Sequence, residues 1–219
     1  ATRALLRRDA LPVGAGPALE TITLAEAEAA LSDLAVRTEH SREPATALFP
    51  AVLDPAFDSL PAEVRATHRT MDVSHWRGEA SVLRGTGWWS RLLGRIFGFP
   101  PAADHVPVEV TKSVTPRGEI WERRFANRGF HSRLAATSGG MIEGFGFLTF
   151  RLGLRVEDGA LHFPVLSGRL GPLPLPRWLL PVSIAREYAE DGRFCFDVRI
   201  LAPVTQDLLV QYRGWLVTA

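Results

Sequence analysis

The stretch SIAREYAEDGRFCFDVRIL, from Ser183 to Leu201, carries the clearest structural signal in this chain. β-Rich runs lie on both sides of Asp191-Gly192, and apolar residues alternate with polar ones, as they do in half-buried strands. An Asp-Gly pair between two alternating runs is the strongest short-range signal of a β-hairpin. The stretch therefore predicts two long antiparallel strands joined by a tight turn.

The same pattern extends over the second half of the chain. From His105 onward, Val106, Val108 and Val110 alternate with polar residues, and turn signals recur at strand-length spacing. The further turn signals are Pro116-Arg117-Gly118, Ser138-Gly139-Gly140, Asp158-Gly159, and Pro203 with Asp207. The β-rich runs between turns are Ile120–Phe125, Met141–Val156, Leu161–Leu166, Ser183–Ala189, Phe194–Leu201 and Leu208–Val217. Successive hairpins of this kind predict an antiparallel meander.

Helical signals come before the meander. The capping-box sequence Thr23–Glu26 predicts a helix that reaches about Val36. A second helix is predicted to begin near Ser59-Leu60-Pro61, and a third to run from Trp88 to Phe97. One strand, Glu79–Arg84, is predicted between these last two helices.

Together these elements predict an α+β fold. We expect a strongly curved antiparallel sheet, or half-open barrel, of about eight strands that wraps one or two helices, because long antiparallel sheets usually close around something. The architecture is calycin-like or helix-grip-like, although the long C-terminal helix of a helix-grip fold is missing. Residues 1–47 are expected to form an N-terminal arm, a short helix and a tether. Residues 48–219 are expected to form the sheet domain.

The composition excludes several classes of protein. With 46% hydrophobic residues and a net charge of +1, the chain is neither disordered nor globally attracted to nucleic acid. No run approaches the roughly 18 apolar residues of a membrane-spanning helix. The single cysteine, Cys195, excludes a disulfide framework and is expected to be a structural thiol. With one thiol and no signal-peptide pattern, the expected location is cytoplasmic.

The basic residues are strongly skewed toward arginine. Lys112 is the only lysine in the chain. Because alanine and proline are abundant along with arginine, we attribute most of this skew to a GC-rich source. Arg123 and Arg186 are the arginines most expected to carry function, because they lie in alternating aromatic strands rather than in loops.

A series of short motifs resembles the bacterial domain-of-unknown-function 4166 family over about Leu48 to Val217. The motifs are Leu60-Pro61-Ala62-Glu63-Val64-Arg65-Ala66-Thr67-His68, Glu119-Ile120-Trp121-Glu122-Arg123-Arg124-Phe125 with Phe130 and Ser132 behind it, Glu143-Gly144-Phe145-Gly146, Leu173-Pro174, Arg186-Glu187, Asp191-Gly192-Arg193-Phe194 and Tyr212-Arg213-Gly214-Trp215-Leu216. Domains of that family often follow a domain that resembles saccharopine dehydrogenase. The resemblance therefore implies a dehydrogenase-like partner, in cis or in trans, and no established activity or catalytic residue.

The strand Trp121–Phe125 is the leading candidate for a binding site. Trp121, Arg123 and Phe125 share one face of the strand. An arginine between two aromatic rings on a concave face is suited to an anionic head group. The alternative is that Arg123 pairs with a carboxylate such as Glu143 or Glu187. Glu143 lies on an apolar strand, so its carboxyl group has to be paired or protonated.

These features predict an accessory domain that binds a hydrophobic or lipid-like small molecule in an internal pocket. The predicted ligand-binding residues are Trp121, Arg123, Glu143, Arg186, Tyr212 and Trp215. No catalytic residue, metal or cofactor is predicted. His68, Asp72 and His75 form only a loose set of metal-binding residue types. The glycine-rich stretch Gly139–Gly146 precedes a strand, whereas a dinucleotide-binding loop precedes a helix.

Two alternatives stay open. The first is an acid–base enzyme, such as an isomerase or cyclase, that uses Glu143 or His68 in the same cavity. The second is a module that contacts a membrane surface or a protein through the helix Trp88–Phe97 and the proline-fenced loop around Trp178. For that helix we favour a role as a plug inside the curved sheet, and so a membrane contact is not favoured. No nucleic-acid partner is expected.

Overall fold

The computed structural model describes residues 23–34, 47–96 and 98–219, and it divides the chain into two compact units, Ala1–Pro44 and Ala45–Ala219. Among the described residues, no helix is long and apolar enough to cross a membrane. The predicted domain boundary at residue 47 stays an expectation, because residues 35–46 are outside the described part.

In the first unit the described residues form one helix, α2 (Leu24–Leu31). The capping box is confirmed: the backbone N–H of Glu26 donates to Oγ1 of Thr23 at 3.2 Å, and the Glu26 carboxylate accepts from the N–H of Thr23 at 2.8 Å. The helix ends five residues before the predicted Val36, because the backbone and side chain of Ser32 both turn back to the carbonyl of Ala29.

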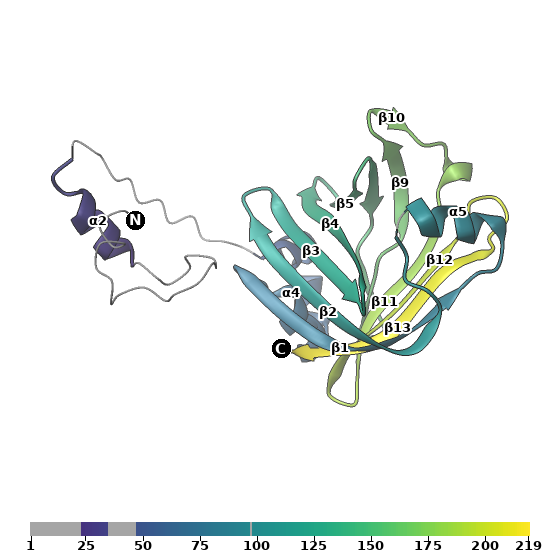
Figure 1. Cartoon of the computed structure of the whole chain (residues 1–219), viewed down its shortest axis with the longest axis horizontal. Helices are drawn as coiled ribbons and strands as arrows, with labels where there is room; N and C mark the ends of the chain where they lie inside the picture. Colours follow the sequence, from purple (N-terminus) through teal and green to yellow (C-terminus); the bar gives the residue numbers. More distant parts are fainter. Residues whose placement is uncertain (1–22, 35–46, 97) are drawn as a thin grey trace. The chain divides into compact units, whose positions relative to one another are not determined.

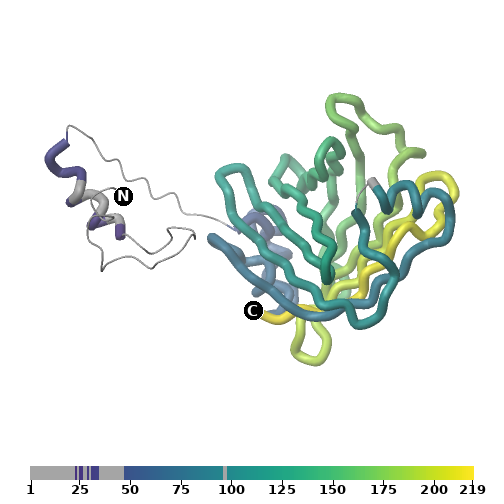
Figure 2. Tube along the Cα trace, in the orientation of Figure 1, coloured from purple at the N-terminus to yellow at the C-terminus, as the bar shows by residue number. Residues whose placement is uncertain are grey.

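The second unit is built around one antiparallel sheet of thirteen strands, which Figure 1 shows to be strongly curved. In sheet order these are β10 (Leu173–Pro174), β9 (Val165–Leu170), β6 (Leu148–Leu152), β5 (Gly140–Phe145), β4 (Arg128–Thr137), β3 (Gly118–Phe125), β2 (Ala103–Thr115), β1 (Val73–Arg84), β13 (Leu208–Thr218), β12 (Arg193–Leu201), β11 (Val182–Glu190), β8 (Ala160–His162) and β7 (Arg155–Glu157). The hydrogen-bonded order is linear, so the ladder is not closed. The last strand ends beside the start of β1 (Figure 2), where the N–H of Ala219 donates to the carbonyl of His75.

The Asp-Gly turns form the hairpins that the sequence predicts. Both Asp191 and Gly192 have positive φ angles, 50° and 68°, between β11 and β12. Asp158 and Gly159 do the same between β7 and β8, at 50° and 70°. Positive φ at both central residues gives the turn a twist that matches the twist of the flanking strands.

The predicted number of about eight strands is wrong, because two of the β-rich runs are broken into five strands, β5 to β9, and because β4 and β10 were not predicted. Met141–Val156 is interrupted at Gly146, whose φ of 57° reverses the chain between β5 and β6. Leu161–Leu166 is divided between β8, which pairs with β11, and β9, which pairs with β6. The α+β class and the antiparallel sheet are confirmed. The predicted strand Glu79–Arg84 is the second half of the longer β1.

Three short helical segments pack on one face of the sheet: α3 (Leu48–Leu53), the 3-10 helix η1 (Ala56–Ser59) and α4 (Ala62–His68). α3 contacts β4, whereas α4 contacts β11 and β12. Phe49, Phe57 and Val64 enter the main apolar core between these helices and the strands. The sequence predicted α4 but not α3, because a six-residue helix with a central proline carries little periodic signal.

The third predicted helix, α5 (Trp88–Ile96), packs on β13 through one side only. Ser90 and Gly94 are buried, whereas Trp88 and Leu92 are exposed. The expectation that this helix plugs the sheet does not fit these exposed side chains. α3, η1 and α4 contribute the helical side chains of the apolar core instead. Phe97, the last residue of the predicted helix, is outside the described residues.

Candidate functional site

A cluster of charged and aromatic side chains lies between α4 and the concave face of the sheet. Trp121, on β3, is its centre and is 5% exposed. The ammonium group of Lys112 lies 3.8 Å from the centre of the Trp121 indole ring, and the Arg123 guanidinium lies 4.7 Å from it. The ring of His68 stacks on the indole at 5.6 Å. Both cations are attracted to the π system of Trp121.

His68 and Glu187 form a buried hydrogen bond in this cluster. His68 Nε2 lies 2.5 Å from Glu187 Oε2. Burial, reinforced by the nearby charge of Lys112, lowers the pKa of His68 to about 4, so the imidazole is neutral and donates this hydrogen bond. Burial opposes ionisation of Glu187, but the neighbouring His68, Lys112 and Arg123 outweigh it and lower the pKa of this carboxyl group.

Lys112, from β2, fixes the end of α4 to the sheet. Its Nζ donates to the backbone carbonyl of Thr67 at 2.8 Å, in the last turn of the helix. A cation at this position also interacts favourably with the helix dipole. Burial lowers the pKa of Lys112 to about 7, although Glu187 and Glu119 partly oppose the shift.

Glu119 anchors α3 in a similar way. Its Oε2 accepts a hydrogen bond from Nε1 of Trp121 at 2.7 Å, and its carboxylate also accepts one from the backbone N–H of Leu48. Burial raises the pKa of Glu119, and these hydrogen bonds oppose that rise only in part. The second oxygen, Oε1, is buried and has no partner among the described residues.

Arg123 was predicted either to bind an anionic head group or to pair with a carboxylate such as Glu143 or Glu187. Its guanidinium donates to Oγ of Ser132 at 2.8 Å and to Oε1 of Glu143 at 3.2 Å. Both members of this ion pair are mostly buried, with side-chain exposures of 18% and 14%. Arg123 therefore lies on the concave face, and it is paired with Glu143 rather than with Glu187.

The hydrogen bonds of this buried cluster hold α3 and α4 against the sheet. His68, Lys112 and Glu119 are each at most 2% exposed, so water and substrate do not reach them. General acid–base chemistry needs a group within hydrogen-bond reach of a substrate. His68 is therefore closed to a substrate, whereas Glu143 is 14% exposed and held in its ion pair with Arg123, so the acid–base alternative stays a prediction.

The six predicted ligand-binding residues fall into two groups. Trp121, Arg123, Glu143 and Tyr212 share the concave face, whereas Arg186 and Trp215 lie on the opposite face. Side chains alternate along a strand, and the neighbours of the last two, Glu187 and Leu216, are the ones that point inward.

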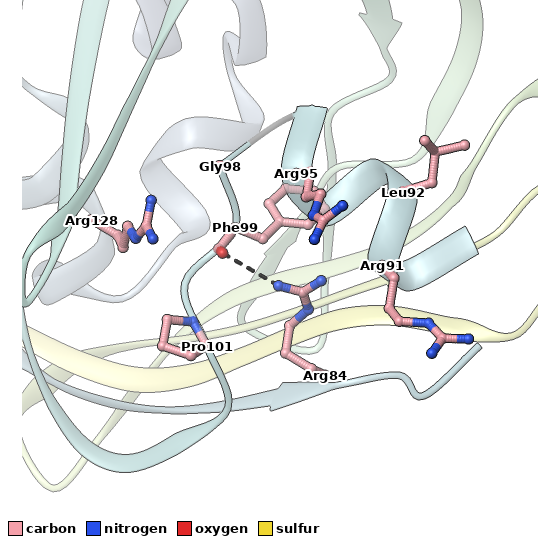
Figure 3. Close-up of a pocket in the computed structure, with 9 residues that line it drawn as sticks. Arg84, Arg91, Leu92, Arg95, Gly98, Phe99, Pro101 and Arg128 are labelled. Atoms are coloured by element: carbon pink, nitrogen blue, oxygen red, sulfur yellow. Dashed lines mark hydrogen bonds between the residues drawn. The ribbon is translucent and has the colours of Figure 1, made fainter. Parts of the chain in front are cut away.

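A surface cavity of about 730 Å³ opens beside α5 (Figure 3). It is lined by Arg84, Arg91, Leu92, Gly94, Arg95, Gly98, Phe99, Pro101 and Arg128. None of these described lining residues is acidic, and four are arginines. The volume lies within the range of small-molecule sites, roughly 300–1,000 Å³.

Arg84 is the structural arginine of this cavity. Its guanidinium donates to the carbonyls of Ser90, Phe99 and Pro100 at 2.6, 3.3 and 3.2 Å, and Nε donates to that of Leu209 at 3.3 Å. Gly94 leaves room for it, since a Cβ atom there would lie 1.9 Å from Nη2 of Arg84. Arg84 thus holds α5 and the segment after it in place.

Unlike Arg84, the other three arginines that line the cavity are not held by the fold. Within the described part of the chain, no hydrogen bond or ion pair holds Arg91, Arg95 or Arg128, and all three side chains are exposed. Figure 3 shows Arg128 across the Gly98–Pro101 segment from the helix. These arginines leave the rim of the cavity with three uncompensated positive charges.

An aromatic series connects this cavity with the predicted site. Phe99 meets the ring of Tyr212 edge to face at 6.3 Å. Tyr212 contacts Phe125 at 4.9 Å and Phe130 at 6.4 Å, and the Arg123 guanidinium lies 5.6 Å from the Phe130 ring. The Tyr212 hydroxyl is buried without a partner among the described residues. Burial raises its pKa, and the charges of Arg84 and Arg123 oppose this only partly.

A second cavity, of about 380 Å³, lies on the outer face and includes Trp215. Its lining contains both carboxylates and arginines, and Glu79 pairs there with His105 at 2.7 Å. Its mixed charge suits an apolar ligand less well than the first cavity does.

The sequence did not identify the residues of the first cavity or Lys112. Arg91, Arg95 and Arg128 look like ordinary surface arginines in a chain rich in arginine. Lys112 had one usable signal, since it is the only lysine and lies on the apolar face of a predicted strand. The loose set of His68, Asp72 and His75 is not brought together, and the described residues contain no metal-ligating cluster of three.

Comparisons with known proteins identify a family but no activity. A family model, described as domain of unknown function (DUF4166), matches residues 60–216. A search of curated proteins gives no match. One similar solved structure is a protein of unknown function from the DUF3598 family of Nostoc punctiforme PCC 73102, at 14% identity and a TM-score of 0.37. That comparison covers 66% of this chain and 47% of the other one.

Proposed function

This chain belongs to the DUF4166 family, and we propose that its sheet domain binds an anionic amphiphile, a small molecule with an apolar body and a negatively charged head group. The binding site is the cavity beside α5. The curved sheet serves as a half-open barrel around this ligand and the interior helices.

The observation that carries the proposal is the charge of the cavity rim. Arg91, Arg95 and Arg128 have no acidic partner among the described residues, and the wall between them is mostly apolar, with Leu92 and Phe99. Guanidinium groups bind phosphate and carboxylate through paired hydrogen bonds. A phosphate or carboxylate head with a hydrocarbon tail matches both parts of this surface.

The buried hydroxyl of Tyr212 supports the same proposal. A buried polar group without a partner costs roughly 1–3 kcal/mol. Phe99 lines the cavity and packs edge to face on the Tyr212 ring, with ring centres 6.3 Å apart. A ligand that displaces the Phe99 ring would supply a partner for the hydroxyl and reach the predicted residues Arg123 and Glu143 behind it.

The dehydrogenase-like partner rests on the family resemblance alone, and we keep it as a proposal. A domain that holds an amphiphile without changing it would present that molecule to a separate active site. Coexpression of this chain with a saccharopine-dehydrogenase-like domain, followed by size-exclusion chromatography, tests for a stable complex.

The binding proposal is tested by titrating the whole chain with dodecyl phosphate below its micelle-forming concentration, using isothermal calorimetry. We expect saturable one-to-one binding, and binding to the uncharged dodecyl maltoside that is weaker by at least tenfold. Arg128→Gln is expected to weaken dodecyl phosphate binding about tenfold, which equals about 1.4 kcal/mol.

Arg124→Gln is the matched control, because Arg124 is equally exposed but pairs with Glu109 away from the cavity. It is expected to leave binding unchanged. Equal affinity for charged and uncharged detergents, or equal losses in the two arginine variants, would contradict the proposed site.

A further inference from the structure

The outward face of α5 combines apolar and basic side chains. Trp88 is 58% exposed and Leu92 is 44% exposed, one turn apart on the helix. Trp88 also stacks on Trp89, with ring centres 4.1 Å apart. Large exposed aromatic side chains on a helix are typical of contact surfaces rather than of ordinary solvent-facing positions.

Two arginines flank this apolar face. Arg91 and Arg95 are exposed, one helical turn apart, and no described residue forms an ion pair with either. The sequence from Gly85 to Ala103 contains no acidic residue at all. The helix therefore presents uncompensated positive charge directly beside its apolar side chains.

Contacts on the inward side of α5 keep Trp88 and Leu92 facing outward. The buried Ser90 donates from Oγ to the carbonyl of Leu209 at 2.8 Å, and its own carbonyl accepts from Arg84 at 2.6 Å. Gly94, on the same inward side, fits against the Arg84 guanidinium. Because both inward positions are committed to β1 and β13, the helix cannot turn its apolar side chains inward without losing these bonds.

We infer that α5 is a docking surface for an anionic phospholipid bilayer, on which the helix lies parallel to the membrane plane. Tryptophan is favoured at the boundary between head groups and hydrocarbon, and leucine enters the hydrocarbon. Arginines on the flank contact lipid phosphates. Each basic residue near an anionic surface is expected to contribute roughly a fivefold gain in affinity. The charge of the partner follows from the charge of the helix.

Docking at α5 also places the bilayer at the cavity rim. Arg91, Leu92 and Arg95 belong both to the outward face of the helix and to the lining of the cavity. A lipid could therefore pass from the bilayer into the cavity without crossing water. This last step rests on the proposed function, whereas bilayer docking itself does not.

A second exposed apolar surface competes as the contact. It includes Phe147, Leu170 and Leu173, at the β5–β6 and β9–β10 turns; Trp178, in the 3-10 helix η2 (Arg177–Leu179), is likewise exposed. The N–H of Gly171 donates to the carbonyl of Phe147 at 2.7 Å, which joins the two turns. The experiment has to separate this surface from α5.

The test is cosedimentation of the whole chain with vesicles of phosphatidylcholine, and with vesicles of phosphatidylcholine and phosphatidylglycerol at three to one. We expect binding to the anionic vesicles that is at least tenfold stronger and that falls several-fold between 0.1 M and 0.5 M salt, because salt screens the arginines. Trp88→Ser is expected to reduce binding at least fivefold. Met71→Ser, an equally exposed position at the other end of β1, is expected to leave it unchanged.

Several results would overturn the inference. These are equal binding to both kinds of vesicle, no binding to either, and loss of binding in Trp178→Ser but not in Trp88→Ser. Trp88 does not line the cavity, so dodecyl phosphate binding in solution should survive Trp88→Ser. Vesicle binding should likewise survive Arg128→Gln. Failure of docking and failure of the cavity proposal are therefore distinguishable.

Discussion

At the scale of single residues, the Lys112 ammonium group lies beside an indole ring and near two carboxylates, where solvent does not reach it. Its hydrogen bond to the Thr67 carbonyl holds the end of α4 against β2. Removing one charge from such a cluster leaves the others unbalanced. The clearest effects of this residue are therefore on how stability depends on pH.

Lys112→Met is expected to flatten the rise in stability between pH 7 and pH 9. The pKa of Lys112 is about 7 in the folded chain and has its ordinary value, 10.5, in the unfolded chain. Between these values the unfolded chain binds the extra proton, so the free energy of unfolding rises with pH, by at most about 1.4 kcal/mol per pH unit. Below pH 7 both states are protonated and this contribution is constant. Urea unfolding at the two pH values measures the slope, and identical slopes in both proteins would refute the assignment.

His68 is expected to remain neutral at mildly acidic pH. Its pKa of about 4 in the folded chain lies below the ordinary 6.5 of the unfolded chain. The unfolded chain therefore binds the extra proton between pH 6.5 and pH 4, and this residue lowers stability as the pH falls through that range. A histidine ring signal in NMR spectra should stay constant above pH 5 and should vanish in His68→Gln. Titration of that signal near pH 6.5 would show that the ring is exposed.

At the scale of elements, the attachment of α5 depends on one close contact. A Cβ atom at Gly94 would lie 1.9 Å from Nη2 and 2.7 Å from Cζ of Arg84, whose guanidinium is held by backbone carbonyls. Gly94→Ala is expected to cost about 1–3 kcal/mol of stability, because either the helix or Arg84 must move. In the Gly94→Ala variant, the backbone amides of α5 should also exchange hydrogen faster than in the unmodified chain.

Gly87→Ala is the matched control for this substitution. Its added Cβ would meet only Oδ2 of Asp207, at 3.8 Å, which is an ordinary contact. We expect a change in the free energy of unfolding, measured in urea, of less than about 0.5 kcal/mol. Equal destabilisation by both substitutions would show that the Arg84 contact does not hold the helix.

The elements differ in how far the sequence predicts them. Asp191-Gly192 and the capping box at Thr23 are local, because neighbouring residues alone determine their geometry, and both are confirmed. α3 depends on burial of Phe49 against His68 and Trp121, whose ring centres lie 3.9 and 5.6 Å away. Such contacts join residues far apart in the sequence, so periodicity could not reveal them.

In the candidate site, too, the sequence predicts local features but not contacts between distant segments. Alternation along β3 correctly places Trp121 and Arg123 on one face, and Glu143 was named as a partner of Arg123. The outward positions of Arg186 and Trp215 depend on which residues of β11 and β13 face the core, and the strands carry apolar residues on both faces. The α5 cavity is formed by side chains from three separate segments, and their proximity is a property of the fold.

At the scale of the whole molecule, a closed apolar core lies apart from an open cavity rim. The charged cluster around Trp121 fastens helices to sheet at one end of β1. The arginines and apolar side chains of α5 lie at the other end of that strand, where Arg84 joins them to it. Ligand binding and bilayer contact are both assigned to this open end.

The most direct measurement is a crystal structure of the chain with dodecyl phosphate bound at saturation. We predict the phosphate within hydrogen-bond distance of Arg128 and of Arg91 or Arg95, with the tail directed past Phe99 toward Tyr212. A phosphate on other arginines, a tail in the outer cavity at Trp215, or an empty α5 cavity would contradict it.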